Sequence, residues 1–294
     1  DAQGKPVPVA LIQGNIAQDL KFQPQHYAGT LAAYRRMIEA NRAQLTILPE
    51  TAIPRFLDQV DPAYLDDLAA IARRRGGDLL IGVPFRNRSG DYFNGVVSLG
   101  QAQPQFYAKS HLVPLGEFVP SEFRWIVGAL RIPLSDFSQG TLPKPLLAGG
   151  ERVGITVCYE DAFGEELIAQ LPEATLLANL SNVAWFGDSL APGQHLQISR
   201  MRAIETGRYM LRATNTGVTA IIDERGAVVA RLPLFTEGVL LGKAQPFVGA
   251  TPYVRSGNRL VLASCLLMLA AGMLIFFMGL FGNEMAARGR SDVA

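Results

Sequence analysis

Three polar residues that follow short apolar runs could together carry out acyl transfer through a thioester. Glu50 closes LTILPE, Lys109 follows QFYA, and Cys158 closes VGITVC. A thiol of pKa about 8.5 is mostly protonated at neutral pH, so a nucleophilic cysteine needs a base and a nearby cation. Glu50 could take the thiol proton. Lys109 could favour the thiolate and then stabilise the oxyanion of a tetrahedral intermediate.

Residues adjacent to these three could support the same reaction. The backbone N–H of Tyr159, directly after the candidate nucleophile, could be a second oxyanion donor. Glu117, in PLGEFVP, could orient the lysine or the substrate. The acidic pair Glu160–Asp161 suits hydrogen bonding in a site, but it is also compatible with the start of the next helix.

The sequence alone leaves other roles open for these residues. A cysteine–histidine pair is the alternative chemistry, because His26, His111 or His195 could meet Cys158 in space. Each residue taken singly also has an ordinary structural role. Glu50 could cap a helix, and Lys109 could be a solvated lysine in a loop. Cys158, after a buried strand, could be an inert apolar residue.

Alternating strands and helices would bring these residues to strand ends, where α/β sheets present ligands. Apolar runs bounded by turn residues predict eight strands. The runs are 9–13, 45–49, 79–83, 95–99, 153–157, 175–180, 218–223 and 238–242. Residues 26–43, 62–75 and 194–207 have helical spacing, and the last ends at Gly207. This alternation, followed by a strand-rich part, predicts a layered α/β domain.

Composition excludes several classes of protein. With 27 Lys+Arg against 26 Asp+Glu, the chain lacks the cation excess that nucleic-acid binding requires. Hydrophobic residues at 49% and charged residues at 18% exclude a disordered chain. Two cysteines make no disulfide scaffold, and the absence of CxxC or a Cys/His cluster argues against zinc. We expect neither a metal nor a cofactor.

The last part of the chain predicts a transmembrane helix. Residues 260–282 are 23 positions without a charge. At 1.5 Å per residue they form a helix of about 34 Å, enough to cross a hydrocarbon core of roughly 30 Å. Arg255 and Arg259 precede the span and Arg288 and Arg290 follow it, so the distribution of positive charge does not orient it.

These observations divide the chain into a catalytic domain at 1–256, a transmembrane helix at 257–282 and a short polar tail at 283–294. Residues 246–258, with spaced Pro, Gly and Ser, are expected to link the first two. Because the chain begins at Asp1 without an initiator Met, we expect it to be a processed or truncated piece.

Two apolar segments that contain tryptophan indicate contact with lipid. Residues 123–134, FRWIVGALRIPL, suit the headgroup boundary of a bilayer, with a buried helix or loop as the alternative. Residues 183–186 include Trp185, which could line an acyl tunnel or pack inside the domain. A thioester formed beside lipid must be shielded from water, which suits a mobile apolar lid.

Three segments resemble the Glu–Lys–Cys triad segments of the nitrilase, or carbon–nitrogen hydrolase, superfamily. They are LTILPETAIP, YAKSHLVPLGEFVP and GITVCYEDAFGE, and their key residues are 59 and 49 positions apart. Within it the chain is most similar to the apolipoprotein N-acyltransferase family. That similarity rests on VALIQGNIAQDLKF, PLSDFSQG (133–140), the segment 184–223 and the apolar C-terminus, and it runs from about Val7 to Gly282.

The resemblance implies an α-β-β-α sandwich followed by one transmembrane helix. It implies that Glu50 is the general base, Lys109 the oxyanion stabiliser and Cys158 the nucleophile. Supporting roles are implied for Glu117, Tyr159 and Glu160.

The implied reaction moves a fatty acyl chain by a ping-pong mechanism. The donor is phosphatidylethanolamine, and the acceptor is the α-amino group of the diacylglyceryl-cysteine that begins an apolipoprotein. The implied location is the bacterial inner membrane, with the catalytic domain facing the periplasm and more membrane helices upstream. The alternatives are a membrane-tethered amidase that uses the same triad and a catalytically silent lipid- or protein-binding module.

Two residues depart from the pattern of the family. Phe22 stands where members often have Trp, and Val183 stands where members often have Asp. Neither belongs to the triad, so both bear on substrate contacts rather than on the reaction.

Overall fold

The structure is a computed structural model that describes residues 1–114, 116–118, 137–141 and 143–291. The chain divides into two units, Asp1–Val254 and Arg255–Ala294. The first holds two six-stranded sheets and the helices that cover them, and the second consists mainly of one long helix. The boundaries predicted from the sequence, at 256/257 and 282/283, stay predictions.

The first sheet is built around three parallel strands. Its order is β14-β1-β2-β3-β6-β7, in which β1, β2 and β3 are parallel and the other pairings are antiparallel. The strands are β1 (Val7–Gln13), β2 (Leu45–Ile47), β3 (Asp78–Gly82), β6 (Gly95–Gly100), β7 (Gln105–Ala108) and β14 (Gly238–Ala244). Helices α2 (Pro24–Glu39) and α3 (Pro62–Arg74) connect the parallel strands, as a parallel pair requires.

The second sheet repeats this plan. Its order is β13-β12-β11-β10-β9-β8, with β9, β10 and β11 parallel and the edges antiparallel. The strands are β8 (Leu146–Ala148), β9 (Glu151–Val157), β10 (Leu176–Ser181), β11 (Met210–Thr214), β12 (Ala220–Ile222) and β13 (Val228–Arg231). Helices α5 (Gly164–Leu167) and α6 (Ala191–Thr206) lie along the crossovers between its parallel strands.

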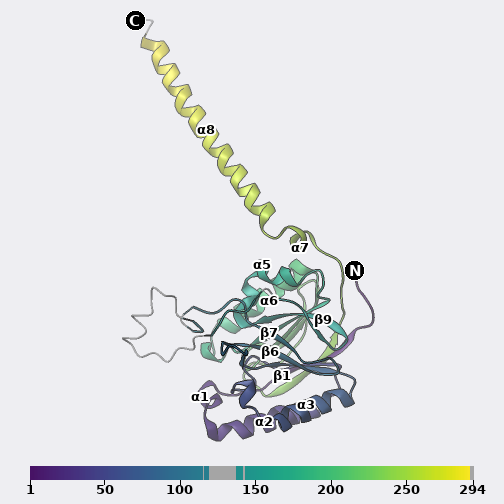
Figure 1. Cartoon of the computed structure of the whole chain (residues 1–294). Coiled ribbons are helices and arrows are strands. Elements are labelled where there is room, and N and C mark those ends of the chain that lie inside the picture. Colours follow the sequence, from purple (N-terminus) through teal and green to yellow (C-terminus); the bar gives the residue numbers. More distant parts are fainter. Residues whose placement is uncertain (115, 119–136, 142, 292–294) are drawn as a thin grey trace, which may run out of the picture. The chain divides into compact units, whose positions relative to one another are not determined.

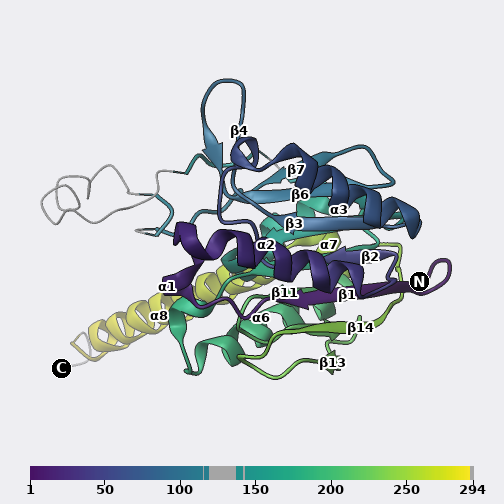
Figure 2. The ribbon, with the colours of Figure 1, turned by 90° about the horizontal axis from the view of Figure 1, so that it is seen from below.

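The two sheets pack face to face with helices outside. A buried apolar cluster joins the facing sides of the sheets, with Leu11 and Ile47 from one and Ile155 and Leu180 from the other. A second cluster lies between the first sheet and α2 and α3, and a third between the second sheet and α5 and α6. Figures 1 and 2 show α2 and α3 over one outer face. The α-β-β-α sandwich expected from the resemblance is therefore confirmed.

All eight strands predicted from apolar runs are present, and so are the three helices. α6 ends as predicted, with Gly207 in the left-handed region at φ +62°. α2 ends at Glu39 rather than at 43, because the Asn41 side chain donates to Met37 O (3.1 Å) and Ile38 O (3.2 Å) and so satisfies two terminal carbonyls. Strands β7, β8, β11 and β13 and the hairpin of β4 (Phe85–Arg86) and β5 (Tyr92–Phe93) were not predicted as strands.

The second unit contains the helix that the sequence predicts to span a membrane. α8 (Arg259–Ser291) includes a 21-residue window, Arg259–Gly279, with a mean hydropathy of 2.6. By length and composition this window is sufficient to cross a bilayer. The helix continues into the segment predicted as a polar tail, and α7 (Pro252–Ser256) lies within the segment predicted as a linker.

Candidate active site

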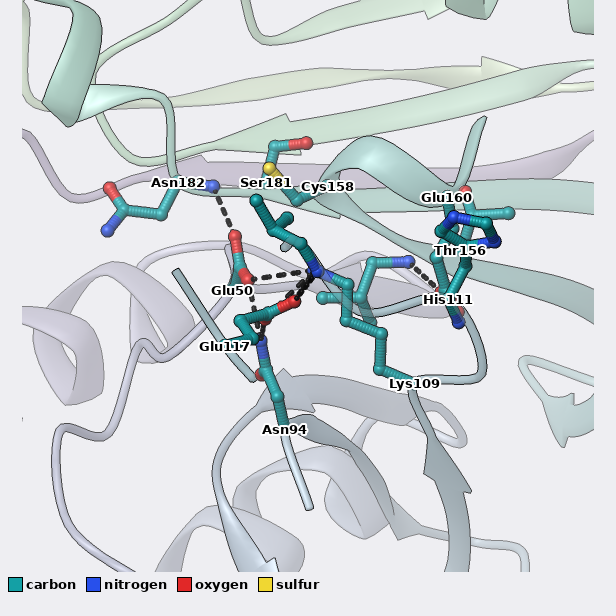
Figure 3. A network of polar contacts seen from close by, with 12 residues as sticks. Glu50, Asn94, Lys109, His111, Glu117, Thr156, Cys158, Glu160, Ser181 and Asn182 are labelled. Atoms are coloured by element: carbon teal, nitrogen blue, oxygen red, sulfur yellow. Dashed lines mark hydrogen bonds and ion pairs between the residues drawn. The ribbon is translucent and has the colours of Figure 1, made fainter. Parts of the chain in front are cut away.

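The three candidate catalytic residues lie at the carboxyl ends of strands from both sheets. Glu50 follows β2, and Lys109 directly follows β7, both in the first sheet. Cys158 directly follows β9 in the second sheet. Figure 3 shows the three side chains in one cluster with Glu117 and Asn94. The face-to-face packing of the sheets therefore brings together residues 59 and 49 positions apart in the sequence.

Cys158 stands at a strained turn between β9 and the short helix η3 (Cys158–Ala162). Its φ is +53°, a value that residues with a side chain rarely adopt. Such strain persists where the surroundings over-determine the backbone, and it is frequent at active sites. Here two donors hold the Cys158 carbonyl, the Asn179 side-chain amide at 3.0 Å and the His195 ring at 3.1 Å. A sharp strand-to-helix turn of this kind projects its first side chain out of the sheet.

A buried ammonium joins two carboxylates beside this turn. Lys109 is 1% exposed, and its Nζ lies 2.8 Å from Glu117 Oε2 and 3.9 Å from Glu50 Oε1. The Asn94 side-chain amide donates to both carboxylates, at 2.7 Å each. Burial lowers the pKa of Lys109, but the attraction of Glu50, Cys158 and Glu117 outweighs it, so that the pKa is raised above its ordinary value. The ammonium is therefore a fixed positive charge.

Glu50 is held on its other oxygen by the second sheet. The backbone N–H of Asn182, which follows β10, donates to Glu50 Oε2 at 2.8 Å. The residue Glu50 is 8% exposed, and each oxygen of its carboxylate accepts a hydrogen bond. These bonds aim the carboxylate while leaving further lone pairs free to accept a proton.

The surroundings of Cys158 favour the thiol over the thiolate. Burial and then the negative charge of Glu50 raise the pKa of Cys158 to about 12. Lys109, Arg212 and the Asn182 N–H oppose this rise but do not cancel it. A nucleophilic Cys158 therefore needs a base that removes its proton at the moment of attack, and Glu50 is the carboxylate placed for it.

Glu160 fastens the loop after Lys109 to the turn that carries Cys158. It is 2% exposed and accepts hydrogen bonds from both segments. The donors are Tyr107 Oη (2.8 Å), Ser110 N (2.6 Å), His111 N (3.0 Å) and Val157 N (2.7 Å). Burial raises the pKa of this carboxyl group, while the donors from Val157 and His111 oppose the rise. Its place supports a positioning role rather than a chemical one.

The cysteine–histidine alternative is not supported by the geometry. His195 Nε2 contacts Cys158 O rather than the thiol, and it also lies 2.8 Å from Asp161 Oδ1. Both partners are acceptors, so this nitrogen carries the proton and donates. His111 pairs with Glu166, 2.7 Å away, and His26 is exposed on α2. Asp161 is fully buried, and through His195 it helps to hold the turn at Cys158 rather than only beginning a new helix.

Tyr159 and Trp185 lie at the surface. Tyr159 is 39% exposed and packs edge-to-face on Phe163, with ring centroids 4.9 Å apart. Trp185, in η5 (Ala184–Phe186), is 71% exposed. The roles predicted for the Tyr159 N–H and for Trp185 stay predictions. The predicted lipid arm at 123–134 lies outside the described residues, and among the described residues no three His, Cys, Asp or Glu side chains form a metal-binding group.

Sequence reasoning missed three residues of this site. Asn94 and Asn182 supply the donors described above, and Lys21 is a second buried lysine whose Nζ donates to Glu50 O at 3.2 Å. Asn182 ends the apolar run at β10, so the rule that selected Glu50 would have selected it too. Nothing in the local sequence marks Lys21, because its burial comes from packing against Glu50.

Comparison with known proteins identifies the family of the chain. A family model described as carbon–nitrogen hydrolase matches residues 8–253. The chain is 54% identical over 281 residues to a protein named apolipoprotein N-acyltransferase from Nitrosomonas europaea, covering 94% of this chain and 56% of that protein. It is 49% identical to a protein of the same name from Chromobacterium violaceum, covering 92% and 54%. The chain thus spans about half the length of the curated relatives it matches.

Solved structures share the fold. Nit3 of Saccharomyces cerevisiae, a member of the nitrilase superfamily, superposes with a TM-score of 0.62 at 16% identity, over 89% of this chain and 97% of that one. An amidase of Nesterenkonia from the same superfamily gives a TM-score of 0.59 at 23% identity, over 82% and 91%. Taken with the match of the family model over most of its length, these likenesses show that the chain belongs to the carbon–nitrogen hydrolase family.

Proposed function

We propose that this chain is the catalytic part of an apolipoprotein N-acyltransferase. The observation that carries the proposal is a partly buried thiol at a strained strand end, beside a carboxylate and an ammonium, in a chain about half identical to proteins of that name. The cluster supplies a nucleophile, a base and an oxyanion stabiliser, which are the parts that acyl transfer through a thioester needs.

In the first half-reaction, Glu50 accepts the thiol proton as the Cys158 sulfur attacks an ester carbonyl of the phospholipid. Lys109 stabilises the oxyanion of the tetrahedral intermediate, aided by the Tyr159 backbone N–H. The carbon–oxygen bond then breaks, and Glu50 returns its proton to the leaving alkoxide. The products are the acyl-enzyme thioester and a lysophospholipid.

In the second half-reaction, an α-amino group attacks the thioester. Glu50 takes a proton from the attacking nitrogen, the carbon–sulfur bond breaks, and the thiolate is reprotonated. The product is an amide on the amino-terminal diacylglyceryl-cysteine of the apolipoprotein. Glu117 keeps Lys109 in place throughout, because it contacts the ammonium at 2.8 Å.

We place the enzyme in the bacterial inner membrane, with this domain on the periplasmic side and phosphatidylethanolamine as the acyl donor. The apolar window of α8 supports a membrane anchor by length and composition. Exposed apolar side chains in and after η5 support a lipid substrate, since Trp185, Phe186 and Leu190 are 71%, 58% and 80% exposed. Phe22, 59% exposed, retains an aromatic contact surface where relatives often carry Trp.

The test is intact mass spectrometry of the chain in detergent with phosphatidylethanolamine, in wild-type and Cys158→Ala forms. The proposal expects a hydroxylamine-labile fatty-acyl adduct in the wild type that is absent from the variant. A diacylglyceryl-cysteine peptide should then discharge the adduct and gain its mass. Discharge by water with no peptide product, together with hydrolysis of simple amides, would instead identify the tethered amidase. Wild-type protein that remains unmodified and inactive on both substrates would contradict the proposal.

A further inference from the structure

A second lysine is buried against the backbone of Glu50. Lys21 ends the short helix α1 (Gln18–Lys21) and is 3% exposed. Its ammonium donates to the backbone carbonyl of Glu50 at 3.2 Å. The mechanism above assigns it no step. A buried cation is costly unless nearby negative charge offsets its lost hydration, so its surroundings must supply that charge.

The charges around Lys21 show what offsets it. Burial lowers its pKa to about 8, while the negative charges of Glu50 and of an ionised Cys158 raise it. Lys21 is thus mostly charged at neutral pH. Its charge acts on Glu50 and Cys158, the two groups that exchange the proton.

The charge count of the cluster requires a second cation. Glu50 and Glu117 bring two negative charges, and Lys109 brings one positive charge. These three groups and Cys158 sum to −1, both before and after Glu50 takes the thiol proton. With Lys21 the sum becomes 0. Arg212 also acts on Cys158, but its own ion pair is with Asp161, at 3.4 Å.

Contacts with the second sheet hold the segment that carries Lys21. Gln18 Oε1 accepts from the Asn182 side chain at 2.9 Å, next to the backbone N–H that binds Glu50. Upstream, Ile16 exchanges hydrogen bonds with the Asn215 side chain, at 2.9 and 2.7 Å. The ammonium is therefore placed by the same strand ends that place the triad.

We propose that Lys21 is a positioning residue of the reaction. Its buried ammonium offsets one of the two negative charges that Glu50 and Glu117 bring, so that the positive charge of Lys109 stays available to the Cys158 thiolate and to the oxyanion. This inference rests on the proposed function, in which Cys158 is the nucleophile. Lys21 itself forms no bond with the substrate and transfers no proton.

The experiment measures the rate at which iodoacetamide alkylates Cys158 at pH 7, below the pKa of Lys21, in the full chain in detergent. Peptide mass spectrometry follows the Cys158 peptide separately from that of Cys265, the other free thiol. The variants are Lys21→Met, which keeps the length of the side chain but not the charge, and Lys21→Arg, which keeps the charge. Lys243→Met is the matched control, because it makes the same substitution at an exposed lysine of β14.

The proposal expects Lys21→Met to lower the alkylation rate of Cys158 at pH 7 by at least about tenfold. That factor corresponds to a rise of about one unit in the pKa of the thiol, the lower end of the effect of an opposite charge at short range. Lys21→Arg should restore most of the rate, and Lys243→Met should leave it unchanged. A Lys21→Met rate equal to that of the wild type, or a Lys243→Met rate that falls as far, overturns the inference. Wild-type Cys158 that is not alkylated would contradict the proposed function instead.

Discussion

The substitution Glu50→Gln separates the chemical role of this carboxylate from its structural one. The amide has the same shape but cannot accept the thiol proton at neutral pH. Burial is the largest cause that raises the pKa of Cys158, and it remains in the variant, so the thiol still needs a base. General-base catalysis contributes about 10²–10⁴-fold. We therefore expect acyl-enzyme formation to slow by that factor, or about 2.7–5.4 kcal/mol of barrier.

The structure sets the expected cost in stability much lower. Glu50 accepts two hydrogen bonds, from the Asn94 amide and the Asn182 N–H. A glutamine offers one oxygen, so one of these donors loses its acceptor, which costs about 1–3 kcal/mol. Lys109 does not become an isolated buried charge, because Glu117 remains 2.8 Å away. The variant should fold.

Single-turnover mass spectrometry of the acyl adduct measures the first effect, and denaturant unfolding measures the second. Glu237→Gln is the matched control, because its carboxylate pairs with Arg36 at the exposed surface of the domain. A folded Glu50→Gln protein that acylates at the rate of the wild type would refute the assignment of Glu50 as the base. A variant that fails to fold would show instead that the carboxylate is structural.

Three further results are expected. Cys158→Ala should abolish labelling by an acyl probe directed at the active thiol, whereas Cys265→Ala, in the apolar helix, should not; equal labelling of both variants would refute the choice of nucleophile. Gly82→Ala should lower both stability, by about 1–3 kcal/mol, and acylation. The new Cβ would lie 2.6 Å from Glu50 Cα and push the base out of place. Calorimetry should measure the loss of stability, and acylation kinetics the loss of rate. The wild-type free energy of unfolding should rise relative to that of Lys21→Met between about pH 8 and 10.5, because the folded protein releases the Lys21 proton first. Denaturant unfolding measures both free energies, and equal pH dependence in the wild type and Lys21→Met would contradict the prediction.

The sequence predicts the central strands well, and it selects three polar residues that the structure brings together, for a physical reason. Parallel strands buried on both faces must be continuous apolar runs, so β1, β3 and β9 are visible without the structure. Polar residues at their carboxyl ends are then candidates for chemistry. Glu50 and Cys158 follow from this rule, after β2 and β9. Lys109 does not, because it follows the antiparallel edge strand β7, and only the short run QFYA indicated it.

Elements that depend on tertiary partners were not predictable in the same way. β11 carries Arg212 in its middle, and this arginine is tolerated because Asn179 and Ser199 accept its hydrogen bonds at 2.8 and 2.9 Å. β8 has three residues and β13 alternates half-buried with exposed positions, so neither has a strong apolar signal. Lys21 looks like an ordinary surface lysine in a four-residue helix.

The pairing of β14 with β1 sets the order in which the domain can be completed during synthesis. β1 is made early, but all seven of its residues pair with β14, which ends at residue 244. A nascent chain therefore has an unsatisfied sheet edge until almost the whole domain has left the ribosome. The half that carries Glu50 and Lys109 is closed only after the half that carries Cys158 has been made. Acyl transfer competence should thus arise late and in one step, just before the apolar helix follows.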